Sequence, residues 1–308
     1  MDTNGGTFLI GALTWPPRIE FRKEPLIWLF VGLGSLVLFL FVTFPYGAFQ
    51  SRILSELNRG TGWEVRATDW SRGIPLGVEW HNLTWTKPGT SSIPIQVMRL
   101  DVGLIGMIMG QPTMEALVQF PGSGQVGGGR VTGAVSASSW SLRGPVSLRG
   151  HVQQVDLTVV AKPYIKRGLL QADITHRWEN RAKEGIVFKG DGSWKVEVKN
   201  LELERIPIGA GFVPSLSFGR VNATLNCRDS VCDIVEFKGD GPDGTVTAQG
   251  RILLQQPLQS STLDLSVSVL AGVGWAQKAG NLPIPPLPPG TPLKFKLVGS
   301  VAKPNLTL

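Results

Sequence analysis

The chain has 308 residues, 30 Lys and Arg against 23 Asp and Glu, and a formal net charge of +7. That length suffices for one large domain or two small ones. With three His and two Cys, the sequence offers few ligands for a metal or redox centre. It also lacks the dense basic runs, interleaved with aromatic residues, that indicate a nucleic-acid partner.

An uncharged apolar run of 19 residues, Leu26–Phe44, follows a 25-residue N-terminal segment. Because a helix rises about 1.5 Å per residue, the run matches a hydrocarbon core of roughly 30 Å. A helix also pairs its own backbone polar groups, as lipid requires. We therefore predict a transmembrane helix over residues 26–44. Its anchoring side chains would be those of Leu26, Trp28, Phe30, Leu36, Phe39, Phe41 and Phe44.

A cleaved signal peptide is the alternative, with a cut conceivable within the residues Pro45, Tyr46, Gly47 and Ala48. The apolar part of a signal peptide is usually about 7–15 residues, and this run is longer and starts later, which favours a retained anchor. Arg18, Arg22 and Lys23 precede the run, and basic residues tend to stay in the cytoplasm. We expect residues 1–25 to be a cytoplasmic tail and the rest of the chain to lie beyond the membrane.

Residues 45–62 predict a second, linking helix. One face carries four apolar residues at spacings of three and four, namely Tyr46, Phe49, Ile53 and Leu57. Gly60 is a suitable C-terminal stop. We expect this face to pack on the first strands. The alternative, a helix lying on the bilayer surface, is less favoured because the charges of the helix are mixed.

From residue 63 to 308 the dominant pattern is the two-residue alternation of strands. The 38 Gly and 22 Pro of the chain punctuate these segments, which is typical of an antiparallel meander. The fold class is therefore predicted as mainly β. Strands are expected at Trp63–Thr68, Val78–Leu83, Gln96–Leu104, Glu115–Phe120, Arg130–Ser136, Val146–Gly150, Val155–Val160, Leu169–Arg177, Ile186–Lys189, Lys195–Leu203, Arg220–Cys227, Cys232–Lys238, Thr245–Leu253, Ser261–Val269 and Leu293–Val301.

Four other segments interrupt this pattern. Val102–Met109 and Val269–Lys278 are apolar enough for short helices, although their glycines weaken that interpretation. Gly122–Gly129 lacks the Gly-Lys-Ser/Thr end of a phosphate-binding loop, so we interpret it as a flexible hairpin connection. The proline-rich segment Leu282–Pro292 is expected to be extended and stiff.

No catalytic, cofactor-binding or metal-binding motif is evident in the sequence. His81, His151 and His176 lack metal-ligand spacing, and no Gly-x-Ser-x-Gly elbow marks a hydrolase nucleophile. We expect the three histidines to be structural strand residues, and the protein to be non-enzymatic and to work without a cofactor.

Cys227 and Cys232 flank the four residues Arg-Asp-Ser-Val, with strand-like sequence on both sides. A four-residue hairpin loop would bring the two cysteines opposite each other, where Cβ atoms lie about 4.5–5.5 Å apart. This favours a structural disulfide, which an oxidising compartment would preserve. The spacing differs from the redox-active Cys-x-x-Cys motif. Two reduced thiols are the alternative.

The stretch Leu225–Val269 resembles the C-terminal half of the long form of the type II secretion system protein GspN. The similarity consists of the cysteine-bearing hairpin, the strand with Gly250, Ile252 and Leu254, and the following Pro-Leu-x-x-Ser step at residues 257–261. The ending Leu297–Leu308 and the Phe-Pro-Tyr start at residues 44–46 are also similar. The resemblance thus covers both ends and most of the part beyond the membrane.

That family is similar in architecture to the AsmA-like proteins, which implies a periplasmic domain over residues 63–308 built on a long curved sheet with an apolar groove. The resemblance implies a bacterial inner-membrane protein that serves the type II secretion system in assembly or structure, with other secretion components as partners. A lipid-binding or lipid-transfer protein of the cell envelope, with lipid in the groove, is the alternative. An envelope enzyme is a third class of function, which no residue pattern favours.

Overall fold

A computed structural model describes residues 23–61, 64–73, 76–86, 92–122, 128–139, 144–161, 164–180, 190–204, 206–208, 211–213, 215–255, 260–278, 292–301 and 303–307. Four of the sequence predictions fall wholly or mostly outside the described residues. They are the tail up to residue 22, most of the hairpin connection at 122–129, the strand at residues 186–189 and nearly all of the proline-rich segment at 282–292.

The chain divides into two compact units, Met1–Phe44 and Pro45–Leu308. The first contains helix α1 (Lys23–Thr43). Among the anchor residues, Trp28, Phe30, Leu36 and Phe39 are exposed and Phe41 and Phe44 are half-buried, while the side chain of Leu26 lies outside the described ones.

No single helix in the described ranges is long and apolar enough to cross a membrane. One broken pair of helices, Ile27–Thr43 with Tyr46–Arg59, meets that test together by length and composition. The transmembrane helix at residues 26–44 therefore stays a prediction.

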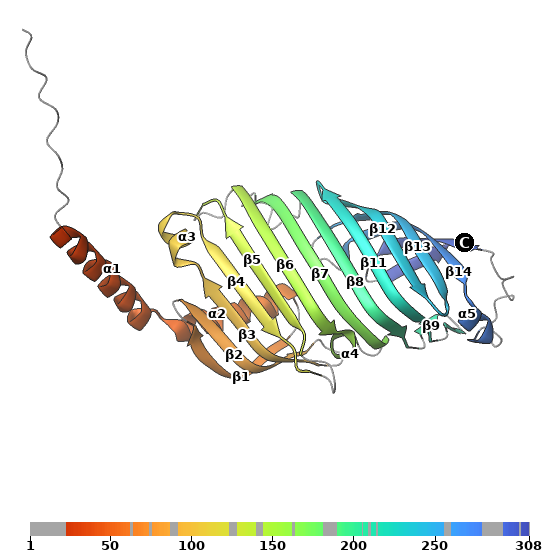
Figure 1. Cartoon of the computed structure of the whole chain (residues 1–308), viewed down its shortest axis with the longest axis horizontal. Coiled ribbons are helices and arrows are strands. Elements are labelled where there is room, and N and C mark those ends of the chain that lie inside the picture. Colours follow the sequence, from red (N-terminus) through yellow and green to blue (C-terminus); the bar gives the residue numbers. More distant parts are fainter. Residues whose placement is uncertain are drawn as a thin grey trace, which may run out of the picture. The chain divides into compact units, whose positions relative to one another are not determined.

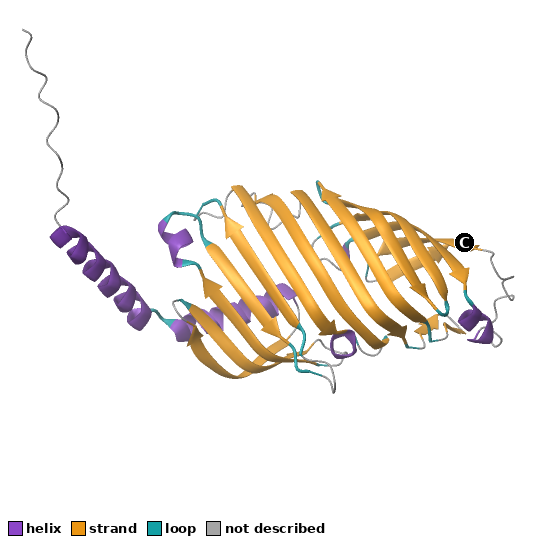
Figure 2. Cartoon of the chain, in the orientation of Figure 1, coloured by secondary structure: helices purple, strands orange, loops and turns teal. Residues whose placement is uncertain are grey.

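The second unit is built on one open antiparallel sheet of fourteen strands (Figures 1 and 2). Neighbours in the chain are neighbours in the sheet, except that β8 pairs with β11 because β9 (Ile206–Ile208) and β10 (Gly211–Val213) form a separate two-stranded sheet. The strands of the large sheet are β1 (Glu64–Gly73), β2 (Gly77–Thr86), β3 (Ile93–Val102), β4 (Thr113–Gln119), β5 (Arg130–Ala137), β6 (Gly144–Asp156), β7 (Ile165–Asn180), β8 (Gly190–Leu203), β11 (Ser217–Arg228), β12 (Val231–Gly241), β13 (Gly244–Leu253), β14 (Thr262–Ala271), β15 (Pro292–Ser300) and β16 (Lys303–Thr307).

The mainly β fold and the antiparallel meander predicted from the sequence are confirmed. Both helical alternatives also form in part, as α3 (Leu104–Ile108) and α5 (Val273–Lys278). The strand predicted at Val155–Val160 is wrong, because β6 ends at Asp156 and helix α4 (Leu157–Val160) follows. The Asp156 carboxylate accepts a hydrogen bond from the Thr158 backbone N–H at 2.9 Å, and this N-cap favours a helical turn over continued extension.

Helix α2 (Tyr46–Thr61) packs across β1 and β2 through its apolar face. Tyr46 is buried, and the other three predicted contact residues are half-buried. The Trp80 indole N–H donates to Gln50 Oε1 at 3.2 Å, and the Val65 backbone N–H donates to Asn58 Oδ1 at 2.8 Å. Of the two arrangements considered from the sequence, the structure therefore has the one in which this helix packs on protein.

Trp80 is the largest fully buried side chain of this contact, with 0% exposure. Replacing it with Ala should lower the free energy of unfolding by about 3–5 kcal/mol, because a large cavity would open under α2. The measurement is urea denaturation of the full-length chain in detergent.

Trp70 is the register partner of Trp80 on β1 and is 36% exposed, so Trp70→Ala is the matched control. A clearly smaller loss is expected there, because the solvent already reaches this ring. Equal losses for the two variants would contradict the packing of α2 on Trp80.

Candidate functional site

The register of the sheet sorts its side chains into two chemically different faces. Directly opposed residues on antiparallel strands lie on the same face, and successive residues alternate between faces. Following the register from β2 to β12 therefore gives rows that cross the sheet. One such row contains only apolar residues, namely Trp80, Met98, Val118, Val131, Val152, Ala172, Val196, Ala223 and Phe237.

A second row lies two residues along each strand, or three residues along β12, and it is also free of polar side chains and reaches β15. It consists of Val78, Leu100, Ala116, Gly133, Gly150, Ile174, Trp194, Leu225, Ile234, Gly250, Leu265 and Leu297. We call the surface that carries these two rows the apolar face. The apolar face is the main candidate for a functional surface, because it is continuous across twelve strands.

The opposite surface, which we call the polar face, carries mostly charged and hydrogen-bonding residues. A row between the two apolar rows illustrates this, with Glu79, Arg99, Leu117, Thr132, His151, Asp173, Lys195, Thr224 and Glu236 in register. Ion pairs join many of these side chains, such as Arg99 with Asp101 at 2.6 Å and Arg220 with Glu197 at 2.9 Å.

On β7, burial differs sharply between the two faces. On β7 the apolar-face residues Ala172 and Trp178 are each 7% exposed, whereas the polar-face side chain of Asp173 is 68% exposed. In the described part of the chain, the main helix–sheet contacts are those of α2 with β1 and β2, of α4 with β3 and β7, and of α5 with β13 and β14. The sheet is curved. In Figure 1 both α2 and the blue C-terminal strands lie behind the nearer strands of the sheet, on the side that holds Trp80.

On the apolar face, three small residues follow one another in register, at Ala116, Gly133 and Gly150. We call this position, where the face lacks large side chains, the hollow of the apolar face. A Cβ atom added at Gly133 would meet nothing closer than 3.8 Å, and one at Gly150 nothing closer than 3.6 Å. Neither glycine has a positive φ, so the backbone alone does not require glycine there. The missing side chains leave space on the face.

Electrostatic effects on the polar face are those of exposed pairs. Lys238 and Asp240 lie 2.8 Å apart, and the hydrogen bond from Lys238 lowers the pKa of the Asp240 carboxyl below its usual value. A lowered carboxyl pKa stabilises the fold above the usual pKa of that group, and the contribution is lost as the pH falls through the folded value. Because both side chains are about half exposed, solvent weakens the pair.

The polar face also has an open hollow of about 760 Å³ lined by His151, Gln153, Asp173 and Lys195, among others. His151 contacts Asp173 through Nδ1 at 2.5 Å and Gln153 through Nε2 at 2.9 Å. Both partners of the His–Asp pair are exposed, and no Ser or Cys lines the hollow. Within the described ranges, no three His, Cys, Asp or Glu side chains gather to hold a metal ion.

The other two histidines lie in different surroundings. His81 Nε2 is 3.4 Å from Glu79 Oε1. His176 is 3% exposed on the apolar side of β7, with its ring centre 5.8 Å from that of Trp178 and 6.2 Å from that of Trp194. Sequence reasoning missed this aromatic cluster. The available signal was the alternation of His176 and Trp178 with the charged residues beside them.

Cys227 and Cys232 are direct partners in the β11–β12 hairpin and form a disulfide with a Cα–Cα distance of 3.9 Å. The connecting loop is shorter than the four residues predicted. Arg228 pairs with Val231, which leaves a two-residue turn of Asp229 and Ser230, both with positive φ. That conformation matches the twist of the flanking strands.

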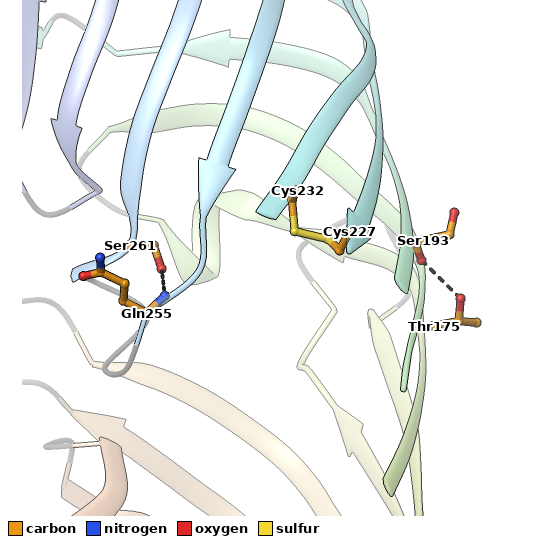
Figure 3. The surroundings of a disulfide bond; sticks show 6 residues. All are labelled: Thr175, Ser193, Cys227, Cys232, Gln255 and Ser261. Atoms are coloured by element: carbon orange, nitrogen blue, oxygen red, sulfur yellow. Dashed lines mark hydrogen bonds between the residues drawn. A yellow bond between two sulfur atoms is a disulfide. The ribbon is translucent and has the colours of Figure 1, made fainter. Parts of the chain in front are cut away.

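The disulfide packs on the apolar side with Leu225 and Leu254, where the two cysteines are 4% and 0% exposed. Figure 3 shows the Thr175 and Ser193 side chains on the side of the strands away from the disulfide, with the Thr175 hydroxyl donating to the Ser193 carbonyl oxygen at 3.4 Å. The disulfide is therefore part of the apolar face and lies near one end of β11 and β12.

Comparisons of the chain with protein-family models, with curated proteins and with solved structures returned no match. The fold and the register therefore define the class. It is a protein with one open antiparallel sheet of fourteen strands, apolar on one face and charged on the other.

Replacing both cysteines with Ala should lower the free energy of unfolding by about 2 kcal/mol, as the loss of a short closed loop predicts. Urea denaturation of the full-length chain would measure this difference. Thiol titration of the unfolded wild-type protein should find no free thiol before reduction and two after it. Two free thiols in the protein isolated under non-reducing conditions would contradict the disulfide.

Proposed function

We propose that this protein binds the acyl chains of lipids on the apolar face of its sheet. The observation that carries the proposal is the second apolar row, which passes from Val78 to Leu297 without a polar side chain. A sheet that only needed a soluble outer surface and a protein core would bury such a face under a second layer.

The dimensions of the row suit several lipids. Strands lie about 4.8 Å apart, so twelve strands span roughly 50 Å. One leaflet of a bilayer provides roughly 15 Å of hydrocarbon, half of the core thickness. Several acyl chains would therefore fit along the face, with their head groups in water. The net charge of +7 favours anionic head groups.

The hollow at Gly133 and Gly150 is the position where an acyl chain would approach the backbone most closely. Ile174 is the register partner of Gly150 and is half-buried on the same face. Its neighbour Thr175 is exposed on the polar face. These two consecutive residues give a matched pair for locating lipid.

A photoreactive amino acid, p-benzoyl-phenylalanine, placed at Ile174 in the full-length protein should crosslink to phospholipid in intact cells. The same substitution at Thr175 should give no adduct, because that side chain faces water. Adducts would be measured by labelling cells with radioactive phosphate and isolating the irradiated protein. The additional change Gly150→Asp should lower the adduct at residue 174 roughly tenfold, which corresponds to about 1.4 kcal/mol of lost interaction.

The control for the added charge is Arg149→Asp, which puts the same carboxylate on the polar face one residue away. It should leave the adduct at residue 174 unchanged. No adduct at residue 174, or equal adducts at residues 174 and 175, would refute lipid binding on this face.

A second proposed function is a structural or assembly role in a type II secretion system, with the chain anchored by one helix in the bacterial inner membrane and its sheet in the periplasm. The support is the resemblance of residues 225–269 and 297–308 to the long form of GspN. In the structure these residues form the end of β11, β12, β13, most of β14, the end of β15 and all of β16, and they include the disulfide hairpin. The two functions are compatible, because the polar face stays available to proteins while the apolar face holds lipid.

In cells that make the protein, it should fractionate with the inner membrane, and a photocrosslinker at Arg149 on the polar face should capture a secretion component. Deleting the gene should reduce secretion of a type II substrate. Normal secretion in the deletion strain, together with no crosslinked secretion component, would exclude this role.

A further inference from the structure

The loop between β3 and β4 carries an exposed apolar tip. Helix α3 lies at the ends of these strands (Figure 1). Ile105, Ile108 and Met109 are 72%, 75% and 73% exposed. The eleven residues 102–112 contain no charged side chain. Exposed apolar groups gathered in this way usually mark a contact surface.

The backbone of the tip is hydrogen-bonded within the tip itself. The Gly103 N–H donates to the Thr113 carbonyl at 2.9 Å, and the Gln111 N–H donates to the Gly106 carbonyl at 2.7 Å. Met107 and Met109 donate to the carbonyl oxygens of Gly103 and Ile105, each at 3.0 Å. A segment that enters lipid must satisfy its backbone in this way, because hydrocarbon offers no hydrogen bonds.

Glycines allow the loop to fold this tightly. A Cβ atom at Gly103 would lie 2.0 Å from Thr113 Oγ1, and one at Gly106 would lie 2.4 Å from the Gln111 carbonyl oxygen. Gly110 has a φ of +76°, which strongly favours glycine. The loop is therefore a folded element that presents its aliphatic side chains outward.

The size of the tip distinguishes between a protein and a membrane as the partner. Three aliphatic side chains offer roughly 200–400 Å² of apolar surface. A stable protein interface needs roughly 800 Å² from each partner and a complementary shape. A bilayer needs neither, because apolar side chains insert about 5–10 Å into the boundary between head groups and acyl chains.

The apolar surface continues from the tip onto the sheet. Met114 and Val135 are register partners on β4 and β5, and they are 41% and 37% exposed. The register then continues to Leu148 on β6. These residues lie on the same side as the apolar rows, two positions from Ala116 and Gly133. A lipid leaving a bilayer at α3 would meet apolar side chains all the way to the hollow.

We propose that α3 inserts into a lipid bilayer and is the site where acyl chains pass between that bilayer and the apolar face. The insertion itself stands alone, while the transfer rests on the lipid binding proposed above. Ile105, Ile108 and Met109 enter the boundary region, and Met114 and Val135 form the first part of the path.

The test uses the full-length chain in vesicles with an NBD fluorophore on Ile108→Cys. The two native cysteines are paired and buried, so the label is specific. Val235→Cys is the control, because Val235 is 61% exposed on β12, away from α3. Lipids with brominated acyl chains, which quench NBD on contact, are placed either in the host vesicles or in added protein-free vesicles.

We expect the NBD fluorescence at residue 108 to be quenched at least twofold in one of the two arrangements. The fluorescence at residue 235 should not be quenched. Quenching at residue 108 no greater than at residue 235 in both arrangements would overturn the insertion. An emission shift at residue 108 that depends on protein density, without quenching, would indicate a second copy as the partner and would also overturn it.

The transfer step is tested with the double variant Ile105→Asp and Ile108→Asp. Both side chains are exposed, so its unfolding midpoint should equal that of wild type. The lipid adduct at Ile174 should fall at least fivefold in cells. An unchanged adduct would overturn the role of α3 in transfer. The two proposals can also fail separately. If the chain with p-benzoyl-phenylalanine at residue 174 and an unaltered α3 gives no adduct, while NBD at residue 108 is quenched, lipid binding on the sheet is refuted and the insertion stands.

Discussion

The register of the antiparallel sheet is the constraint on which the rest of the structure depends. A slip of one residue in any strand would move every apolar side chain of that strand to the polar face. The second apolar row survives eleven consecutive strand pairings between Val78 and Leu297. Such agreement requires that each hairpin be fixed by its own turn and by the burial of one face.

Irregular positions preserve this register where a regular strand would lose it. On β6, Val152 pairs with Ala172 and Val155 pairs with Leu170, so two residues of β6 lie opposite one residue of β7 between these pairs. The added residue lets both valines lie on the apolar face, and Gln154 takes a φ of +48° there. On β12, one additional residue between Ile234 and Phe237 does the same, and Val235 is left exposed. A bulge of this kind changes the phase of the alternation. The turn at Asp229 and Ser230, together with the disulfide, fixes the β11–β12 register at the end nearest to the second of these bulges.

Sequence patterns predicted the elements better than the site. The segment Val78–Leu83 was predicted as a strand because polar and apolar residues alternate along it. Val155–Val160 lacked that contrast, and the capping carboxylate of Asp156 decided for a helix. The sequence alone indicated an apolar face only in general terms. A row across the strands can be traced only when the partner of each residue on the neighbouring strand is known. Gly133 and Gly150 show this well. They are seventeen positions apart in the sequence, and only the register makes them neighbours. The phase change at Gln153–Gln154 was visible as two polar residues in succession, but a single break does not distinguish a bulge from the end of a strand.

The packing of the apolar face also bears on what it can bind. A protein layer that covered this face would need side chains matched to its uneven surface, because protein interiors are close-packed and a void costs stability. Large and absent side chains lie next to one another on this face. The face falls from Trp194 and Ile174 to two glycines on which an added Cβ would have no neighbour closer than 3.6 Å. A fluid acyl chain follows such steps by rotating about its own bonds, so it fills the hollow without a matched surface. Binding to the folded state alone would also stabilise that state. If lipid binds as proposed, the open sheet and the lipid would depend on each other, since the lipid would replace the layer that a self-contained domain would fold over this face.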